Sequence, residues 1–338
     1  MKHNLQGNSQ KVWALLTVIV ITAMLLSGCG SAQEKKVYRV GILDSFTPFS
    51  ELADGFKIGM AELGYVEGKN ISYDIQSSNF DPAEERRIAD QFVADDVDLI
   101  FAYATEGAIS AKEATVGTDI PVVFAFAVLE ENDLVQSVRE PGGNVSGVRF
   151  PGPDLSVKRL ELLHALAPQV KRVGIIYNHN YPANQSQLLE LQPAASAMGL
   201  ILVEIPIESA GEIQADLERR ASADDIGMDG LLIITDDLSQ SPDGWQLISQ
   251  FASEHRIPIA GSAAFEAEAG AVLTYIPNYI ETGKLAAPIA DKIFKGTSPG
   301  TIPVVTPESS LIINYKIAQA LGFEVPEGLL KQADEILR

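Results

Sequence analysis

Residues 38–76 read YRVGILDSFTPFSELADGFKIGMAELGYVEGKNISYDIQ. Two short apolar runs, residues 38–43 and 71–76, flank a segment near residues 52–63 in which apolar side chains recur with helical period. Short apolar strands that alternate with helices are typical of a parallel sheet buried on both faces. The stretch therefore predicts the strand, helix and strand that open an α/β fold.

The same alternation continues along the chain in two series. The first series predicts strands at residues 38–43, 71–76, 99–102, 122–126 and 145–148, with helices near residues 52–63, 83–94 and 108–114. The second predicts strands at residues 172–177, 201–206, 230–235, 257–261 and 271–275, with helices near residues 157–166, 185–198, 210–221 and 245–255. Two such series in 338 residues predict an α/β protein with two Rossmann-like lobes.

The last part of the chain is predicted to connect the lobes. A helix over residues 279–294 precedes an extended stretch that contains Pro303 and Pro307. Proline withholds a backbone donor, so it favours exposed connectors over central strands. We expect three hinge crossings, near residues 150–153, 276–278 and 306–309. The predicted N-terminal lobe then comprises residues 37–150 and 277–306, and the C-terminal lobe comprises residues 151–276 and 307–338.

The amino terminus has the pattern of an export signal. Two lysines precede an apolar run over residues 12–26, which is short for a membrane span of about 20 residues. Residues 26–29 read LSGC, which resembles the site cut by the lipoprotein signal peptidase. We expect a signal peptide at residues 1–28, lipidation of Cys29 and a polar tether at residues 29–36. The alternative is a free cysteine after a leader. A lipid anchor implies a bacterial cell envelope, outside the cytoplasm.

Composition excludes some partners. The chain carries 45 acidic against 25 basic side chains, for a net charge of −20. Such a body repels phosphate backbones and anionic lipid headgroups, so nucleic acid and peripheral membrane binding are disfavoured. Acidic side chains that simply keep an exported protein soluble are the alternative explanation.

Ligands of open parallel sheets bind at the carboxyl ends of the strands. The loops predicted there contain hydroxyls, amides, acids and aromatics, Phe46 among them, but no lysine or arginine. A ligand with an amine would suit them: Asp236 or Asp237 could bind the cation, and Ser45 or Thr105 could bind a carboxylate. Plain helix capping is the alternative for each of these side chains.

Enzyme signatures are absent from the same loops. Residues 41–45 lack the glycines of a dinucleotide-binding turn, and the chain has neither a lysine phosphate loop nor a G-x-S-x-G elbow. His179 is the one histidine in the loops, with no evident nucleophile beside it. The single cysteine excludes an internal disulfide. We expect no catalysis, no cofactor and no metal.

Several stretches, in order and with matching spacing from about residue 40 to the end, carry a resemblance. They are AELGYVEGKN (61–70), VDLI (97–100), PGGNVSGV (141–148), KRVGIIYN (171–178) and ADEI (333–336). The chain resembles the substrate-binding lipoproteins of ABC importers related to the tryptophan- and tyrosine-binding proteins. The resemblance implies a type I periplasmic-binding-protein fold, a cleft that closes on a small ligand, and a monomer that docks on a permease with its ATPase.

Carried over by position, the family's pocket implies binding roles for a set of side chains. They are Ser45, Phe46, Tyr103, Thr105, Phe126, Ala127, Asn184, Thr235, Asp236 and Ser262. The sequence departs from the family pattern at residues 128–131, at Ala263 and at residues 179–182. These are pocket positions, so the ligand of better-known members does not transfer directly.

The leading hypothesis is a binding protein that captures a small amine-bearing metabolite, such as an aromatic or apolar amino acid, for an ABC permease. A ligand sensor for a signalling receptor would share the pocket and differ in its partner. A lipoprotein enzyme on the same scaffold is the third class, because fold alone does not fix function.

Overall fold

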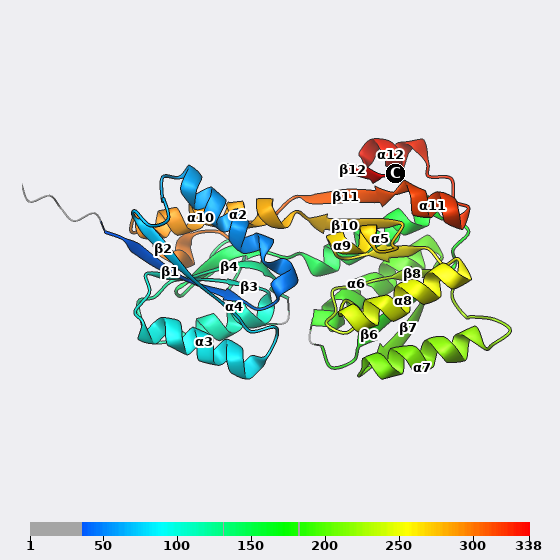
Figure 1. Ribbon diagram of the computed structural model, residues 1–338, viewed down its shortest axis with the longest axis horizontal. Helices are drawn as coiled ribbons and strands as arrows, with labels where there is room; N and C mark the ends of the chain where they lie inside the picture. Colours follow the sequence, from blue (N-terminus) through cyan, green and yellow to red (C-terminus); the bar gives the residue numbers. More distant parts are fainter. Residues whose placement is uncertain (1–35, 131, 182) are drawn as a thin grey trace, which may run out of the picture. The chain divides into compact units, whose positions relative to one another are not determined.

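The computed structural model describes residues 36–130, 132–181 and 183–338 (Figure 1). These residues form a five-stranded sheet in the order β2-β1-β3-β4-β5 and a seven-stranded sheet in the order β12-β11-β10-β9-β8-β6-β7. We refer to each sheet with its covering helices as the N-terminal and the C-terminal lobe. The prediction of an α/β protein with two Rossmann-like lobes is confirmed. The predicted signal peptide and Cys29 lie outside the described residues.

The N-terminal lobe is a wholly parallel sheet between two helical layers. Its strands are β1 (Tyr38–Asp44), β2 (Ile71–Ser77), β3 (Leu99–Tyr103), β4 (Val122–Ala127) and β5 (Val145–Arg149). Its helices are η1 (Thr47–Phe49), α2 (Glu51–Glu62), α3 (Pro82–Ala94), α4 (Thr105–Ala114) and α10 (Tyr279–Phe294). Helices α2 and α10 bury one face of the sheet, and α3 and α4 bury the other. Burial on both faces explains the continuous apolar runs of the strands.

The C-terminal lobe repeats this plan with one antiparallel pair, β10 with β11. Its strands are β6 (Arg172–Asn178), β7 (Ile201–Ile207), β8 (Gly230–Leu232), β9 (Ile259–Gly261), β10 (Leu273–Pro277), β11 (Ser309–Asn314) and β12 (Glu335–Leu337). Its helices are α5 (Gly152–Leu166), α6 (Ala183–Met198), α7 (Ala210–Ala221), α8 (Pro242–His255), α9 (Ala264–Glu268), α11 (Tyr315–Leu321) and α12 (Glu327–Gln332). A short η2 (Pro299–Thr301) precedes β11 in the chain.

Several predicted boundaries were wrong. Helix α5 begins at Gly152 rather than near residue 157, because Pro153 in the first helical turn needs no backbone donor there. Strand β10 spans Leu273–Pro277 rather than residues 271–275, because its antiparallel pairing with β11 continues to Pro277 opposite Ser309. The bounds of this strand are set by its pairing with a distant strand, which a local sequence pattern does not contain.

The chain passes between the lobes three times, as predicted: from β5 to α5, from β10 to α10 and from η2 to β11. The first and third crossings are tied together. The backbone N–H of Arg149 donates to the carbonyl of Val305 at 2.9 Å, and its side-chain Nε donates to Thr306 Oγ1 at 3.0 Å. The Arg149 guanidinium also pairs with Glu130 and Asp154.

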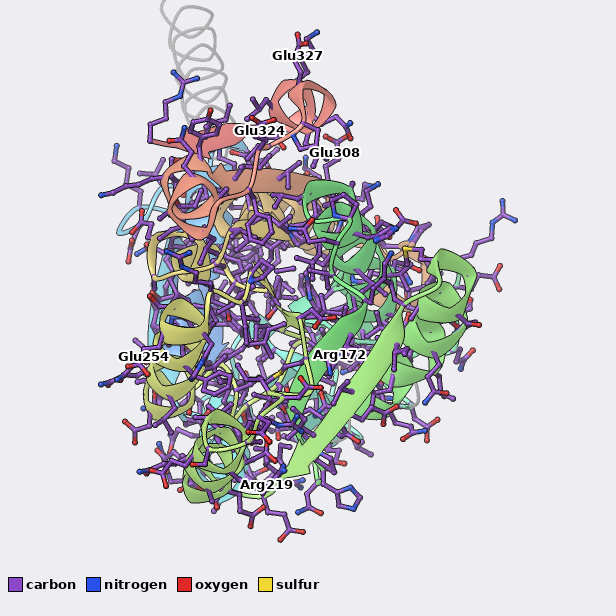
Figure 2. All side chains as sticks on the ribbon, turned by 90° about the vertical axis from the view of Figure 1, so that its right-hand side faces the viewer. Arg172, Arg219, Glu254, Glu308, Glu324 and Glu327 are labelled. Atoms are coloured by element: carbon purple, nitrogen blue, oxygen red, sulfur yellow. The ribbon has the colours of Figure 1, made fainter. Side chains whose placement is uncertain are left out.

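Charged side chains of both signs lie on the surface of the C-terminal lobe. Figure 2 shows Glu254, Glu308, Glu324 and Glu327 pointing outward from it. Basic side chains there are partly neutralised, since Arg172 pairs with Asp225 and Asp229. Within the described part of the chain, no helix is both long and apolar enough to span a membrane.

Candidate ligand-binding site

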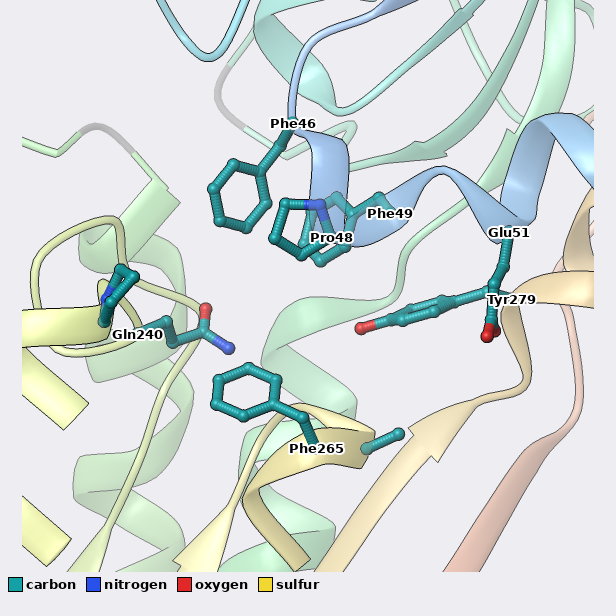
Figure 3. A pocket seen from close by; sticks show the side chains of 9 residues that line it. Phe46, Pro48, Phe49, Glu51, Gln240, Phe265 and Tyr279 are labelled. Carbon is teal, nitrogen blue, oxygen red and sulfur yellow. The ribbon is translucent and has the colours of Figure 1, made fainter. Parts of the chain in front are cut away.

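A pocket of about 610 Å³ lies where loops from both lobes meet (Figure 3). The loops follow β1, β8, β9 and β10 in the chain, and each begins at the carboxyl end of its strand. The lining residues are Phe46, Pro48, Phe49, Glu51, Gln240, Pro242, Ala264, Phe265 and Tyr279. The volume suits a ligand of metabolite size.

The walls of this pocket are mainly aromatic. The ring of Tyr279 lies 5.3 Å from that of Phe49 and 5.2 Å from that of Phe126, between centroids. Phe46 stands edge-on to Phe49 at 5.1 Å. Figure 3 shows Phe46 and Phe49 on one side, Phe265 on the other, and the Tyr279 ring reaching between them. Such rings offer edge and face contacts to another aromatic group.

A smaller pocket of about 30 Å³ adjoins the first and is acidic. Its lining residues are Phe46, Phe49, Phe80, Tyr181, Thr235, Asp236, Asp237 and Gln240. Three of them, Phe46, Phe49 and Gln240, also line the larger pocket, so the two are contiguous. One ligand could therefore contact both an aromatic and an acidic region.

Asp236 is held by protein donors. Its Oδ2 accepts hydrogen bonds from the backbone N–H of Asn178 and from Asn184 Nδ2, both at 2.7 Å. Its Oδ1 accepts from the backbone N–H groups of Leu238 and Ser239 at 3.1 and 2.7 Å. The carboxylate thus fastens the β6 and β8 loops to each other, and it is only 2% exposed.

Asp237 and Glu106 complete the acidic region. Burial raises the pKa of Asp237, whose carboxylate accepts two hydrogen bonds from Asn178 Nδ2. Burial also raises the pKa of Glu106, which faces the Tyr181 hydroxyl and the charge of Asp237. Glu106 comes from α4 of the N-terminal lobe and Tyr181 from the β6 loop, so both lobes contribute. An ammonium group would offset these neighbouring acids.

The other predicted N-terminal-lobe residues are not in the linings of these two pockets. Ser45 and Tyr103 are fully buried beside Asp44, whose pKa burial raises. Thr105 Oγ1 accepts the backbone N–H of Val128 at 3.1 Å, which ties α4 to the loop after β4. Phe126 supports the aromatic wall and has a φ of +56°, a strained value for a bulky residue.

Three more of the predicted residues lie at the end of a strand, next to one, or in the helix that follows one. Ala127 is fully buried at the end of β4. Ser262 donates its hydroxyl to the carbonyl of Ile234 at 3.3 Å. Asn184 donates to the carbonyl of Asn178 at 2.9 Å, besides its bond to Asp236. Of the ten predicted binding residues, Phe46, Thr235 and Asp236 line the two pockets described above. Ligand contact by all ten stays a prediction.

Sequence reasoning missed Tyr279, Phe49, Gln240 and Arg159. Tyr279 opens α10 directly after its N-cap Asn278, which accepts the backbone N–H of Glu281 at 3.0 Å. Arg159 lies inside a predicted helix, whereas the candidate binding residues were sought mainly in the loops at strand ends. Its position in the sequence could have revealed it, because it falls on the same apolar face of α5 as several leucines. The structure buries it fully there.

Among residues 36–130, 132–181 and 183–338, no group of three histidine, cysteine or acidic side chains is arranged to hold a metal ion. The site consists of an aromatic pocket with an acidic recess, set at strand ends. Such a pocket between two Rossmann-like lobes with three crossings defines the type I periplasmic-binding-protein class.

The chain belongs to the ABC transporter substrate-binding protein family, which residues 45–337 match. It is 31% identical over 334 residues to a tyrosine-binding protein of Clostridioides difficile, covering 94% of this chain and 93% of that protein. It is also similar to two solved structures. One is an ABC domain from Streptococcus pneumoniae in complex with L-Trp, with TM-score 0.79, 26% identity, and coverage of 89% and 100% of the two chains. The other is a ligand-free, open substrate-binding protein with adhesive properties from Clostridium difficile, with TM-score 0.69, 29% identity, and coverage of 89% and 99%.

Membership makes this chain an ABC transporter substrate-binding protein, and such proteins act outside the cytoplasm. The family is one of binding proteins rather than enzymes. Capture of a ligand between the two lobes fits both the position of the pocket and the family.

Proposed function

We propose that this chain captures an aromatic amino acid, of the L-tyrosine or L-tryptophan type, and delivers it to an ABC permease and its ATPase. The observation that carries the proposal is the pocket of about 610 Å³ with the rings of Phe46, Phe49, Phe265 and Tyr279 in its lining. An aromatic side chain would replace water against these rings and gain edge and face contacts. The ligands named for the related proteins agree with this chemistry.

The lobes act in the proposal as two bodies. Residues 37–150 with 277–306 form the first, and residues 151–276 with 307–338 form the second. A ligand that contacts both lobes binds the closed arrangement more tightly than the open one. It therefore shifts the equilibrium toward the closed arrangement. The permease would read this closed state on a monomer.

The chain would be held at the membrane through lipidated Cys29, after removal of residues 1–28. Support comes from the LSGC sequence at residues 26–29 and the short apolar run before it. Cys29→Ser should release the protein from the membrane fraction of cells. Retention of that variant in the membrane fraction would remove lipidation from the proposal.

Calorimetric titration and thermal unfolding of the full chain in mild detergent test the function. We expect L-tyrosine or L-tryptophan to bind and to raise the melting temperature, since a ligand that binds the native state alone stabilises it. D-glucose and spermidine serve as controls for sugar and polyamine binding. Stabilisation by a control compound, with no response to any aromatic amino acid, would overturn the proposed ligand class.

A further inference from the structure

Arg159 is a fully buried cation on α5 with hydrogen-bonding capacity left over. Its Nε donates to the carbonyl of Tyr275 at 3.0 Å and its Nη1 to the carbonyl of Ile233 at 3.3 Å. Its Nη2 is buried and has no partner among the described residues. Burial lowers the pKa of Arg159 to about 10, so the guanidinium is still charged at neutral pH. A buried charge with an unused donor is costly unless an anion offsets it.

Arg159 lines neither pocket, and its charge acts through the buried groups next to it. Glu266 and Tyr279 are the groups that act on it electrostatically. Burial raises the pKa of Glu266 to about 7, so this carboxyl group keeps its proton to a higher pH than an exposed glutamate does. Within the described structure, Glu266 Oε1 and the Tyr279 hydroxyl also lack hydrogen-bond partners. Arg159, Glu266 and Tyr279 thus act on one another electrostatically, and each has an unpartnered polar atom.

We propose that Arg159 and the Tyr279 hydroxyl form the subsite that binds the carboxylate of the ligand. Tyr279 lines the pocket, and Figure 3 shows its hydroxyl directed into the space between Phe49 and Phe265. Arg159 supplies the positive charge behind that wall. The assignment rests on the proposed function, because it names the group of the amino acid that this end of the pocket recognises.

The acids of the smaller pocket suggest where the other end of the ligand lies. The smaller pocket carries Asp236 and Asp237, next to Glu106. The larger pocket has one acid in its lining, Glu51, which acts on Tyr279. An amino acid would lie with its ammonium group toward the acids of the smaller pocket and its carboxylate toward Arg159. In this proposal the acids of the smaller pocket and the charge of Arg159 favour one orientation for a zwitterion over the reverse.

Paired ligands with and without a carboxylate test the subsite by calorimetric titration of the full chain. L-tyrosine is compared with tyramine, and L-tryptophan with tryptamine. The wild-type protein should bind each amino acid at least about tenfold more tightly than its amine, the size expected for a charge-assisted hydrogen bond. Arg159→Gln should weaken amino acid binding by about tenfold or more and change amine binding by less than about twofold.

Two further variants make the result specific. Lys158→Gln removes a charge from the exposed side of the same helix and should leave all four affinities unchanged. Tyr279→Phe keeps the ring and removes only the hydroxyl, so it tests the subsite even if Arg159→Gln does not fold. It should weaken the amino acids by about threefold to tenfold and spare the amines.

The outcomes separate the two proposals. The carboxylate subsite would be overturned if the wild type bound amino acid and amine equally well. It would also be overturned if Arg159→Gln and Tyr279→Phe weakened the binding of both equally. The aromatic ligand class would stand in either case. Failure of both amino acids and both amines to bind would overturn the proposed function, and the subsite with it.

Discussion

Asp236, in the loop after β8, and Glu266, in the short helix α9, are both buried carboxyl groups of the C-terminal lobe, but their surroundings differ. Asp236 accepts hydrogen bonds at both oxygens, from four donors. Glu266 Oε2 accepts the backbone N–H groups of Ser262 and Ala263, whereas its Oε1 has no partner in the described part of the chain. Donors stabilise an ionised carboxylate and burial without donors destabilises it. Asp236 is therefore suited to holding loops, and Glu266 to changing its charge near neutral pH.

Asp236→Ala should lower the free energy of unfolding by about 2–4 kcal/mol, because it leaves several buried donors unsatisfied. Denaturant unfolding followed by fluorescence measures the change. Asp224→Ala, at an exposed aspartate of the same lobe, is the control and should stay within about 0.5 kcal/mol of the wild type. An equally stable Asp236→Ala variant with weakened ligand binding would instead place this carboxylate on the ligand.

Glu266 predicts a pH dependence of stability. Its pKa is raised from 4.5 to about 7 by burial, against the opposing effects of Arg159 and Gln240, with Tyr279 facing it from α10. Between these two pKa values the native state retains a proton that the unfolded chain has lost, so this group's contribution to stability falls as pH rises from 4.5 to 7.

Glu266→Gln should remove that dependence, so the variant gains stability relative to the wild type as pH rises through this range. Unfolding in denaturant at pH 5 and pH 8 measures the difference. Glu268→Gln, exposed on the same short helix, should show none. A constant difference between Glu266→Gln and wild type at both pH values would contradict the buried, protonated carboxyl group.

At the scale of elements, α2 and α10 show how distant segments form one layer. They lie side by side on the N-terminal lobe although more than 200 residues separate them (Figure 1). A Cβ on Gly283 would lie 2.1 Å from the carbonyl oxygen of Leu52, and one on Gly55 would lie 2.1 Å from that of Ile280. The helices approach this closely only because both positions are glycine.

Gly283→Ala should therefore destabilise the protein by about 1–3 kcal/mol through overpacking, despite the better helix propensity of alanine. Thermal unfolding in the absence of ligand reports the loss. Gly328→Ala in α12 is the matched control, because a Cβ there meets no atom within 4 Å and the same change should be neutral or stabilising. A Gly283→Ala variant as stable as Gly328→Ala would show that the two helices can separate at little cost.

At the scale of the whole molecule, three crossings carry all covalent connections between the lobes. Two of them are tied by Arg149 to Val305 and Thr306, so they form a paired hinge. The pocket depends on both lobes, since Phe46 and Phe49 come from one and Gln240 and Phe265 from the other. Movement at the crossings would therefore change the pocket directly.

Small-angle scattering tests this coupling. Saturating L-tyrosine or L-tryptophan should lower the radius of gyration, because a ligand that contacts both lobes favours their approach. D-glucose provides the control and should leave the scattering unchanged. An unaltered radius of gyration in the presence of bound ligand would mean that binding does not depend on lobe closure.

Much of the fold was predictable because burial on both faces of a parallel sheet makes each strand a continuous apolar run. Strands β1, β4 and β6 follow their predicted bounds closely for this reason. The candidate site was less predictable. Loops at strand ends could be found from the strand positions, and three residues of these loops, Phe46, Thr235 and Asp236, line the two pockets. Tyr279 and Arg159 could not, because one opens a helix after a crossing and the other lies inside a helix.

The sequence by itself determined the α/β class, the two lobes, the three crossings and the family resemblance, since these depend on local periodicity and on motifs in order. The tertiary structure alone decided which side chains share the pocket. It brought α10 onto α2, tied Asp236 to the β6 loop, and set buried Arg159 beside Tyr279. These arrangements depend on contacts between residues distant along the chain, and no local pattern of apolar and polar residues encodes them.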